Sequence, residues 1–560
     1  MGAHQRPAAG LPAVVVDQPA VDPGGPGGQP GWASRARLAW IGAYLSAGIV
    51  LFLCYLRVSG TQGISSDGGS NALEAWDMLH GNLLLHGWTV TDVSFYTTEL
   101  PEYMLLELIR GLSPALVHTA AALTYTVLVL LAGLVAKGRA TGREGVVRAL
   151  IASGIMLAPQ LGTPTFTLLL VPDHVGTGIP MLLIFLVLDR APRRWYVPPV
   201  IAVMLTWVLV ADRLVIAAAL VPLLLVCAIR VYRAVVILGR PLAAQWFEVS
   251  LFVGGILALG VSLLIVRLIV RLGGFTLLGL GTHLAKLHAL PNTFRLTGQG
   301  VLGLYGADFF DMPFGPQLVI ALLHLIGVIL AGWAVCRALR RFFRCDDLIV
   351  QVLVTGIVVN LAVFAFSNLP YSLWDARNMS PVLAFGAVLA GRLLAGDLLR
   401  LRLLPALAVT LACYTAFLGF DAAQPQIPAH DQSLANWLVA HNFKTGLSTY
   451  FESNITTLDS GDRVHLLGVS WGADKSVPRI YQSDVSWYDP KLHYANFIVN
   501  TGADKPQAII PSGDWLKAFG PPAKTYQYGP YTIMVWNKNL LADLGRPGKK
   551  GPGNVGPAKK

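Results

Sequence analysis

Long apolar runs recur along the first three quarters of the chain, and short polar connections separate them. The first run extends from about Leu38 to Leu56, long enough to cross a hydrocarbon core of about 30 Å as a helix that rises about 1.5 Å per residue. Further runs begin near Ala115, Ala149, Gly176, Val197, Leu214, Phe247, Gln317, Leu348, Asn378 and Leu403. The pattern predicts a polytopic α-helical membrane protein with about eleven membrane-spanning helices.

Basic residues gather in every second connection between these runs. The clusters are Lys137, Arg139, Arg143 and Arg148; Arg190, Arg193 and Arg194; Arg230 and Arg233; Arg337, Arg340, Arg341 and Arg344; and Arg392, Arg400 and Arg402. Such clusters mark cytoplasmic loops. With an odd number of spans, this pattern predicts a multi-pass plasma-membrane protein whose N-terminus is cytoplasmic and whose C-terminal part is extracytoplasmic.

The composition supports this class and disfavours others. Of the 560 residues, 54% are hydrophobic and only 13% are charged, and the mean hydropathy is +0.57. The net charge of +11 does not indicate nucleic-acid binding, because the basic residues follow the loop pattern. The five cysteines have no metal-ligand spacing, so neither a zinc site nor a disulfide framework is expected.

The chain divides into four segments by composition. Residues 1–34 are rich in Pro and Gly and are expected to form a disordered cytoplasmic tail, and residues 542–560 form a basic disordered tail. Residues 35–420 form the transmembrane domain. Residues 421–541 predict a small extracytoplasmic α/β domain, from a helical stretch and three short apolar or alternating runs. These are residues 432–441 for the helix and 464–469, 508–510 and 531–536 for the runs.

The first outer connection, residues 59–113, is too long for a simple link between two spans. Asn71 and Glu74 have the spacing of a capping box, and apolar residues recur after them at helical intervals. We therefore expect an amphipathic helix at the membrane interface, followed by a second from Pro101 to about Leu112.

Asp67 lies between the first span and this helix, among Ser and Gly residues. Its carboxylate is expected near the membrane surface, where a lipid-linked substrate presents its head group. The alternative is that Asp67 only initiates a turn before the helix, as Asp and Gly readily do.

This arrangement resembles the GT-C superfamily of glycosyltransferases, which use polyprenyl-phosphate sugars. The resemblance lies in Asp67, the long loop after the first span, the many spans and the terminal outer domain. The stretches AWDMLHGNLLLHGW and FYTTELP are similar to those of actinobacterial membrane proteins of the glycosyltransferase family 39-like type. The likeness covers the whole chain in architecture and a few residues in motif.

The resemblance implies an inverting transfer in which an acceptor hydroxyl displaces polyprenyl phosphate from a sugar. A carboxylate can serve as the base if burial raises its pKa, and cationic groups must balance the departing phosphate. Asp67 is the expected base, and Glu99 is a second acid that assists it. Glu102 is a weaker alternative, because it can equally begin a helix.

Ionisable residues in the other outer connections are the expected partners of Asp67. Asp173 and His174 are adjacent in a Gly/Pro turn, where Asp173 forms a second acidic site or caps a helix. Arg213 faces the donor phosphate or pairs with its neighbour Asp212.

Arg377, in the last outer connection, is the stronger phosphate ligand, with pairing to Asp375 as its alternative. Together with Arg213 and His174 it makes up the expected donor-phosphate site. The connection from residue 271 to 316 also carries charges, at Lys286, His288, Arg295, Asp308 and Asp311. They are interpreted as solvated loop charge rather than as parts of a lid.

These residues favour a membrane glycosyltransferase acting on the extracytoplasmic face, with a polyprenyl-phosphate-linked donor and a cell-envelope glycan, lipid or protein as acceptor. The alternative is a transporter or flippase of lipid-linked saccharides, although transporters place ionisable residues near mid-membrane. In a third interpretation the C-terminal domain binds glycans through residues such as Trp471, Tyr481, Trp487 and Tyr488, which can equally form a core.

Asp173 and His174 cannot complete a metal site, so no divalent metal is inferred. The transferase hypothesis requires a cavity at the outer membrane boundary that brings Asp67 within a few ångströms of a basic residue from another loop.

Overall fold

The structure is a computed structural model that describes residues 31–279, 281–427, 432–471, 476–478, 480–501 and 512–545. The run 508–510, most of the N-terminal tail and most of the basic C-terminal tail lie outside these residues. The chain divides into two compact units, residues 1–49 and 50–560, and the first helix contributes to both. The helices after the first, the C-terminal domain and the residues of the site all belong to the second unit.

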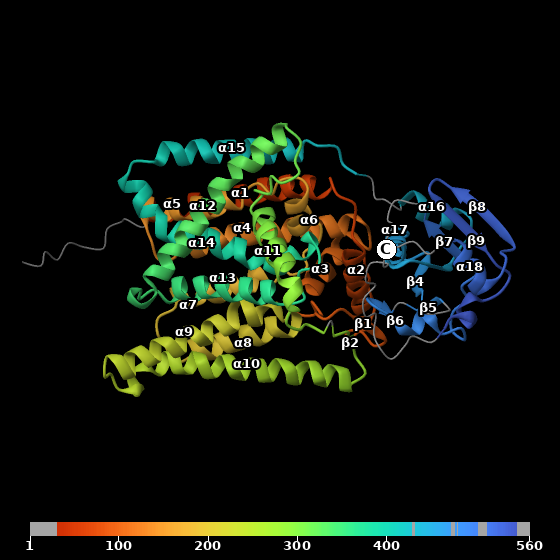
Figure 1. Cartoon of the computed structure of the whole chain (residues 1–560), viewed down its shortest axis with the longest axis horizontal. Coiled ribbons are helices and arrows are strands. Elements are labelled where there is room, and N and C mark those ends of the chain that lie inside the picture. The colour runs from red at the N-terminus through yellow and green to blue at the C-terminus, as the bar shows by residue number, and fades with distance from the viewer. Residues whose placement is uncertain are drawn as a thin grey trace, which may run out of the picture. The chain divides into compact units, whose positions relative to one another are not determined.

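Helices form most of the chain (Figure 1). Their bounds are α1 (Gly31–Ser59), α2 (Ser66–Leu79), α3 (Glu99–Arg110), α4 (Ala115–Lys137), α5 (Gly142–Ile155), α6 (Thr163–Leu169), α7 (Gly178–Arg190), α8 (Val197–Ala211), α9 (Val221–Tyr232), α10 (Trp246–Arg271), α11 (Leu290–Leu304), α12 (Pro316–Arg340), α13 (Leu348–Phe366), α14 (Ser380–Arg400), α15 (Leu404–Ala422), α16 (Gln432–Ala440), α17 (Tyr450–Asp459) and α18 (Ser512–Phe519).

Each predicted apolar run is helical. Within the described residues, eight helices have the length and hydropathy needed to cross a membrane. The runs that form α5, α7 and α8 are helices of 14, 13 and 15 residues, shorter than a bilayer usually requires. The chain is therefore a multi-pass membrane protein, and the count of eleven spans stays a prediction.

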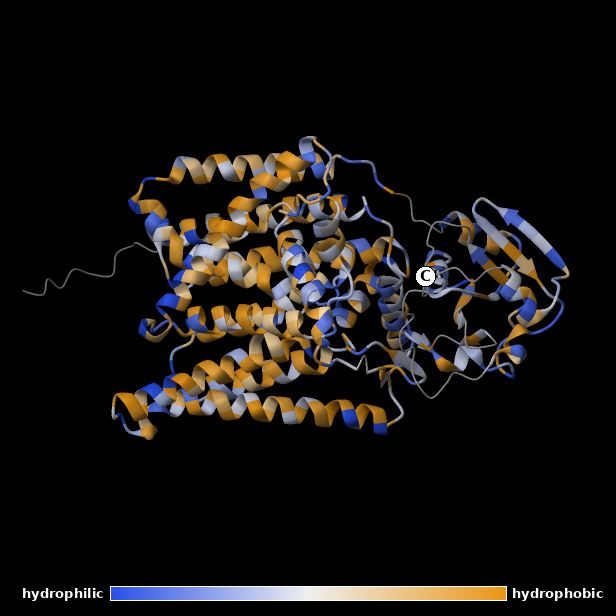
Figure 2. Ribbon diagram, viewed as in Figure 1, coloured by the Kyte–Doolittle hydropathy of each residue, from blue (hydrophilic) through white to orange (hydrophobic). Residues whose placement is uncertain are grey.

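The helix α14 lies at the centre of the bundle, packed against α4, α5, α12 and α13. Phe385 and Leu389 on this helix are completely buried. A Cβ atom at Gly391 would lie 2.4 Å from the carbonyl oxygen of Arg148, so glycine lets α14 approach α5 closely. Apolar residues cover the bundle helices, whereas polar residues gather at helix ends and in the C-terminal part (Figure 2).

The connections separate into two sets, one at each end of the bundle. Residues from the first, second, third and fifth predicted outer connections contact one another, and the fourth joins them through a strand pair, Thr89 with Thr276. We call this the site end. The arginine-rich connections meet at the opposite end, where Arg392 pairs with Asp189 and Asp347. The predicted alternation of the connections is thus seen in the structure.

The first outer connection folds into α2, a short strand and α3. Helix α2 begins at Ser66, and Ser65 caps it by accepting a hydrogen bond from the Gly68 N–H at 3.1 Å. The capping box predicted at Asn71 and Glu74 is therefore wrong, because Asn71 lies inside the helix. Asp67 is in the first turn of α2, where a carboxylate also interacts favourably with the helix dipole.

The C-terminal domain is a six-stranded sheet with helices, which confirms the predicted α/β class. The strands of the described residues are β1 (Trp88–Val90), β2 (Thr276–Leu277), β3 (Thr445–Ser448), β4 (His465–Trp471), β5 (Ser476–Pro478), β6 (Ser483–Asp484), β7 (Phe497–Thr501), β8 (Lys524–Tyr528) and β9 (Tyr531–Val535). The order in the sheet is β5-β4-β3-β7-β9-β8, with β3 parallel to β4 and β7 and the other pairs antiparallel.

This domain is joined to the site end of the bundle by hydrogen bonds. Strand β6 pairs with β1 in a small sheet of order β2-β1-β6. Helix α17 packs on α2, where Asn454 donates a hydrogen bond to the Ser70 hydroxyl at 2.6 Å. A Cβ atom at Gly69 would lie 3.4 Å from the Asn454 backbone, so the small residues of α2 admit α17. The C-terminal domain is thus a fixed part of the site end.

Candidate functional site

An ion pair between Asp67 and Arg377 forms the centre of the site. Arg377 lies in a short 3₁₀ helix, Leu373–Met379, immediately before α14. Its Nη1 donates to Asp67 Oδ2 at 3.0 Å, across 310 residues of sequence. The side chains keep 22% (Asp67) and 32% (Arg377) of their surface exposed, so a ligand can reach both. The structure thus supplies the expected basic residue, whereas none of the cavities described below is lined by Asp67.

Arg377 does not pair with Asp375, so that alternative is wrong. Asp375 instead accepts hydrogen bonds from the Ser372 N–H at 2.7 Å and from the Tyr371 N–H at 3.0 Å. The carboxylate of Asp375 thereby caps the short helix that carries Arg377.

The C-terminal domain contributes Tyr450 to the site. Its phenol donates to Asp67 Oδ1 at 2.7 Å and also contacts the Gln482 side-chain oxygen. A phenol carries a single hydrogen, so only one of these two oxygens accepts it at a time. Sequence reasoning missed Tyr450, because 383 residues separate it from Asp67 and no motif marks it.

The pKa of Asp67 is lower than the ordinary value. Burial alone would raise the pKa, but the charge of Arg377 and the hydrogen bonds from Tyr450 and Arg377 outweigh burial. This is the reverse of the rise that the sequence predicts for a base. Asp67 is ionised at neutral pH, and its basicity depends on whether Arg377 stays paired with it.

Asp173 is a second carboxylate beside this pair. Asn71 of α2 donates to Asp173 Oδ1 at 2.6 Å, and Asp173 is buried. Burial and the neighbouring charge of Asp67 raise the pKa of Asp173 to about 6, against the lowering effect of Arg377 and His174. The N-cap of α7 is Thr177, so the alternative in which Asp173 caps that helix is wrong.

His174 is held by Asp212, at the end of α8. Its Nδ1 lies 2.8 Å from Asp212 Oδ2, and Thr177 Oγ1 donates to the same oxygen at 2.8 Å. Burial lowers the pKa of His174, but the charge and hydrogen bond of Asp212 bring it above the ordinary value. Asp212 therefore favours the protonated, cationic form of His174 near Asp67.

The expected pairing of Asp212 with Arg213 is wrong. Asp212 is fully engaged by His174, Thr177 and the Leu214 N–H. Arg213 is exposed, and none of the ion pairs of the described residues involves it. It lines a small cavity together with Asp92 and Ser94. The structure thus places Arg213 outside the hydrogen-bonded cluster of the site.

Glu99 is the first residue of α3 and is completely enclosed. Its Oε2 accepts a hydrogen bond from the Thr98 hydroxyl, and a Cβ at Gly176 would lie 2.7 Å from its Oε1. Burial and the nearby Asp212 and Asp173 raise the pKa of Glu99 well above its ordinary value, although the Thr98 bond opposes this. Burial thus favours the protonated, neutral form of Glu99.

Glu102 faces α4, where it accepts a hydrogen bond from Thr124 Oγ1 at 2.7 Å. In the connection from residue 271 to 316, Lys286 and His288 are exposed, and Arg295 bonds only to residues of its own helix, Asn292 and Gln299. These contacts agree with the interpretation of Lys286, His288 and Arg295 as solvated charge, whereas that interpretation is wrong for Asp308, whose Oδ1 is buried.

The site residues do not fit a metal centre. Within the described residues, no group of three or more His, Cys, Asp or Glu side chains is arranged to hold a metal ion. The carboxylates near Arg377 are instead engaged by a cation, a phenol or an amide. The side chains of the site are therefore held in place by contacts with one another.

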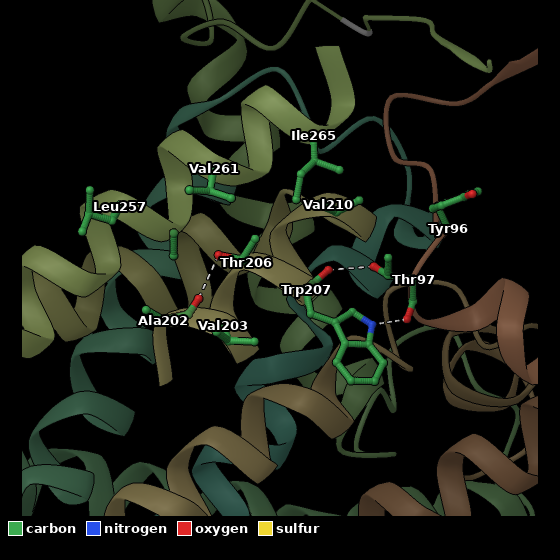
Figure 3. Close-up of a pocket in the computed structure, with 11 residues that line it drawn as sticks. Tyr96, Thr97, Ala202, Val203, Thr206, Trp207, Val210, Leu257, Val261 and Ile265 are labelled. Carbon is green, nitrogen blue, oxygen red and sulfur yellow. Dashed lines mark hydrogen bonds between the residues drawn. The ribbon is translucent and has the colours of Figure 1, made fainter. Parts of the chain in front are cut away.

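An apolar groove of about 480 Å³ opens between α8 and α10, close to the site. Its lining residues include Val203, Leu257 and Val261, and its outer end is formed by Thr97 (Figure 3). The Thr97 hydroxyl donates to the Trp207 carbonyl at 2.7 Å, and the Trp207 indole donates back to the Thr97 carbonyl.

Phe95 packs against the site from the segment that also reaches the groove. It lies two residues before Thr97, and its ring meets the His174 ring edge-on with centroids 5.5 Å apart. Asp67 itself lines neither this groove nor the Arg213 cavity.

No protein-family model matches the chain, and no curated protein matches its sequence. Solved structures do match. The oligosaccharyltransferase of Archaeoglobus fulgidus in its apo form has a TM-score of 0.43 and 11% identity, covering 82% of this chain and 69% of its own. ArnT from Cupriavidus metallidurans in the apo state has a TM-score of 0.42 and 12% identity, covering 91% and 99%.

ArnT bound to undecaprenyl phosphate matches with a TM-score of 0.38 and 11% identity, covering 90% of this chain and 99% of its own. At such low identities and TM-scores, the function of this chain rests on its own residues.

Proposed function

We propose that the chain is a membrane glycosyltransferase that transfers a sugar from a polyprenyl-phosphate-linked donor to a cell-envelope glycan, lipid or protein. The reaction takes place at the site end, which we assign to the extracytoplasmic side because the arginine clusters lie at the other end. The observation that carries the proposal is the ligand-accessible ion pair of Asp67 and Arg377 beneath Tyr450.

Arg377 is the proposed ligand of the donor phosphate. A guanidinium has five N–H donors in a planar fork that matches phosphate oxygens. Within the described residues, only one of these donors is used, in the bond to Asp67. His174, kept cationic by Asp212, is the second group that balances phosphate charge. Arg213 is not included, because it lies in a separate cavity.

Asp67 is the proposed base. When a phosphate draws Arg377 away, the carboxylate loses the charge that lowers its pKa, and it becomes a better proton acceptor. The acceptor hydroxyl gives its proton to Asp67 while its oxygen bonds to the anomeric carbon. The bond from that carbon to the phosphate oxygen breaks, and its electron pair leaves with polyprenyl phosphate, whose charge Arg377 and His174 balance. This displacement inverts the anomeric centre.

The groove between α8 and α10 suits the polyprenyl chain of the donor. It is apolar, and exposed residues of α8 and α10 such as Val203 and Leu257 line it. Thr97 at its outer end lies two residues after Phe95, whose ring contacts His174. A lipid held there would keep its tail in the bilayer and its phosphate at the site. Ala202→Trp, which narrows the groove, should raise the KM for a long-chain donor and leave the KM for a short-chain donor unchanged.

The test is sugar transfer by the purified full-length protein, compared with Asp67→Asn and with Asp311→Asn as a matched control. Asp311 is an exposed outer acid with a φ of 57°, a conformation that asparagine tolerates. We expect Asp67→Asn to lose at least about a hundredfold in kcat, and Asp311→Asn to behave as wild type. Undiminished transfer by Asp67→Asn would remove Asp67 as the base. Movement of lipid-linked saccharide across vesicles without any transfer would favour the transporter.

A further inference from the structure

A second polar cavity, of about 640 Å³, lies at the end of the bundle opposite the site. Five arginines and four acids line it: Arg139, Arg148, Arg193, Arg230, Arg392, Glu144, Asp189, Asp346 and Asp347. These residues come from five separate parts of the chain and take no part in the proposed transfer. Its volume is within the range of ligand-binding pockets.

Arg392 is the centre of a network of ion pairs in the wall of this cavity. Arg392 is buried and bonds to Asp189 and Asp347, each at 2.9 Å, and to the Val135 carbonyl at 2.7 Å. Asp347 also caps α13. A Cβ at Gly138 would lie 2.7 Å from Asp189 Oδ2, so glycine at that position makes room for the network. The Nε of Arg392 is buried and has no hydrogen-bond partner within the described residues.

Most charges around the cavity are neutralised by ion pairs. Arg148 pairs with Glu144 at 2.6 Å, and Arg193 and Arg230 share Glu248 at 2.8 and 3.5 Å. The shared acid leaves one surplus positive charge there. Arg392 is in turn shared by two acids, Asp189 and Asp347, which leaves one surplus negative charge in its network.

Arg139 and Asp346 are the two charges that these pairs leave over. Arg139 donates to two neutral acceptors, the carbonyl oxygens of Asp189 and Ala191, at 2.6 and 3.3 Å. The Asp346 carboxylate is exposed and joins none of the ion pairs of the described residues. Arg139 and Asp346 are therefore the lining charges that join no ion pair of the described residues, and the five arginines of the wall are balanced by its four acids together with Glu248 behind them.

Exposed tryptophans close in sequence to the lining residues indicate that this cavity lies at the depth of lipid head groups. Trp195 is 80% exposed and Trp246 is 41% exposed, and each neighbours residues that line the cavity. Exposed Trp near the ends of membrane helices marks the interface between hydrocarbon and water. Arg193 lies over the Phe247 ring, 5.5 Å from its centroid, so its guanidinium is held at the same depth.

We propose that the cavity binds the ethanolamine phosphate head group of a phospholipid in the adjacent leaflet. The phosphate would lie against Arg139 and the primary ammonium against Asp346. A choline head group offers no N–H donor to Asp346, and a glycerol head group offers no cation. This site is independent of the proposed transferase activity.

The test uses the full-length protein in nanodiscs of mixed phosphatidylethanolamine, phosphatidylcholine and phosphatidylglycerol, with retained lipids counted by native mass spectrometry. Wild type should retain phosphatidylethanolamine over the other two by about tenfold, the effect of one charge-assisted contact. Asp346→Asn should lose the preference for ethanolamine over choline, and Arg139→Gln should lose retention of all three. Arg143→Gln, an exposed arginine in the same connection that does not line the cavity, should behave as wild type.

Equal retention of the three lipids by wild type would overturn the proposal, as would a preference for phosphatidylglycerol. An ethanolamine preference that survives both Asp346→Asn and Arg139→Gln would place the lipid elsewhere. Soluble phosphoethanolamine, added as a competitor, should displace the lipid only weakly. Displacement at equal concentration would overturn the assignment to a membrane lipid.

Discussion

Replacing Tyr450 with phenylalanine tests how the C-terminal domain acts on the site. The change removes only the phenol oxygen, which donates to Asp67 at 2.7 Å, and keeps the ring that packs against Tyr481. Because this hydrogen bond stabilises the ionised carboxylate, its loss raises the pKa of Asp67. The pKa of His174 should change little, since its partner is Asp212.

The size of the shift follows from the hydrogen bond. A bond to a charged group contributes roughly 1.5–3 kcal/mol, and one pKa unit corresponds to about 1.4 kcal/mol. Asp67 keeps 22% of its side chain exposed, so solvent screens part of the effect. We therefore expect the pKa of Asp67 to rise by about one unit.

The assay is kcat/KM for sugar transfer as a function of pH. A base must be ionised, so activity falls as pH drops through the pKa of Asp67, and Tyr450→Phe should move this acidic limb upward by about one unit. Tyr526→Phe, in the same domain but remote from Asp67, should leave the limb in place. An unmoved limb in Tyr450→Phe, with a normal thermal unfolding midpoint, would refute the role of Asp67 as base.

Three further changes test the surroundings of the site. Burial raises the pKa of Glu107 to about 9, so the folded protein keeps a proton that the unfolded chain releases above its ordinary pKa of 4.5. Stability should then fall as pH rises from 5 to 8, by up to about 1.4 kcal/mol per pH unit, and Glu107→Gln should flatten this slope in thermal unfolding. Asp212→Asn should lower the pKa of His174, so that polyprenyl phosphate binds more weakly at neutral pH and regains its affinity in acid. Titration of the protein with polyprenyl phosphate at both pH values measures this. Gly176→Ala would place a Cβ 2.7 Å from Glu99 Oε1. It should lower the free energy of unfolding in denaturant by about 1–3 kcal/mol. An unchanged free energy of unfolding would mean that the Glu99 side chain moves freely.

The fold could be predicted from sequence to the extent that a bilayer constrains it. Apolar runs of sufficient length must form helices, because no other structure satisfies the backbone in hydrocarbon. The alternation of charge then assigns the connections to two sets. In the structure, the connections of each set lie together at one end of the bundle. The start of α2 could not be predicted as well, because Ser65 and Asn71 are both good N-caps and packing against α17 decides between them.

The site was predictable as a set of residue types and not as a set of contacts. Asp67 and Arg377 were expected near the membrane surface, but nothing in the sequence joins two residues 310 positions apart. Asp212 and Arg213 are neighbours, which suggests a pair, yet the end of α8 directs Asp212 toward His174. Such directions depend on helix geometry and burial, which short motifs do not encode.

Binding of sugar-free polyprenyl phosphate to Asp67→Asn and Arg377→Gln tests the central claim most directly. In the structure Asp67 and a phosphate would compete for Arg377, so neutralising Asp67 frees that guanidinium. The account predicts that Asp67→Asn binds at least as tightly as wild type while failing to transfer sugar, and that Arg377→Gln binds at least about tenfold more weakly. Equal loss of binding in both variants, or transfer by Asp67→Asn, would contradict it.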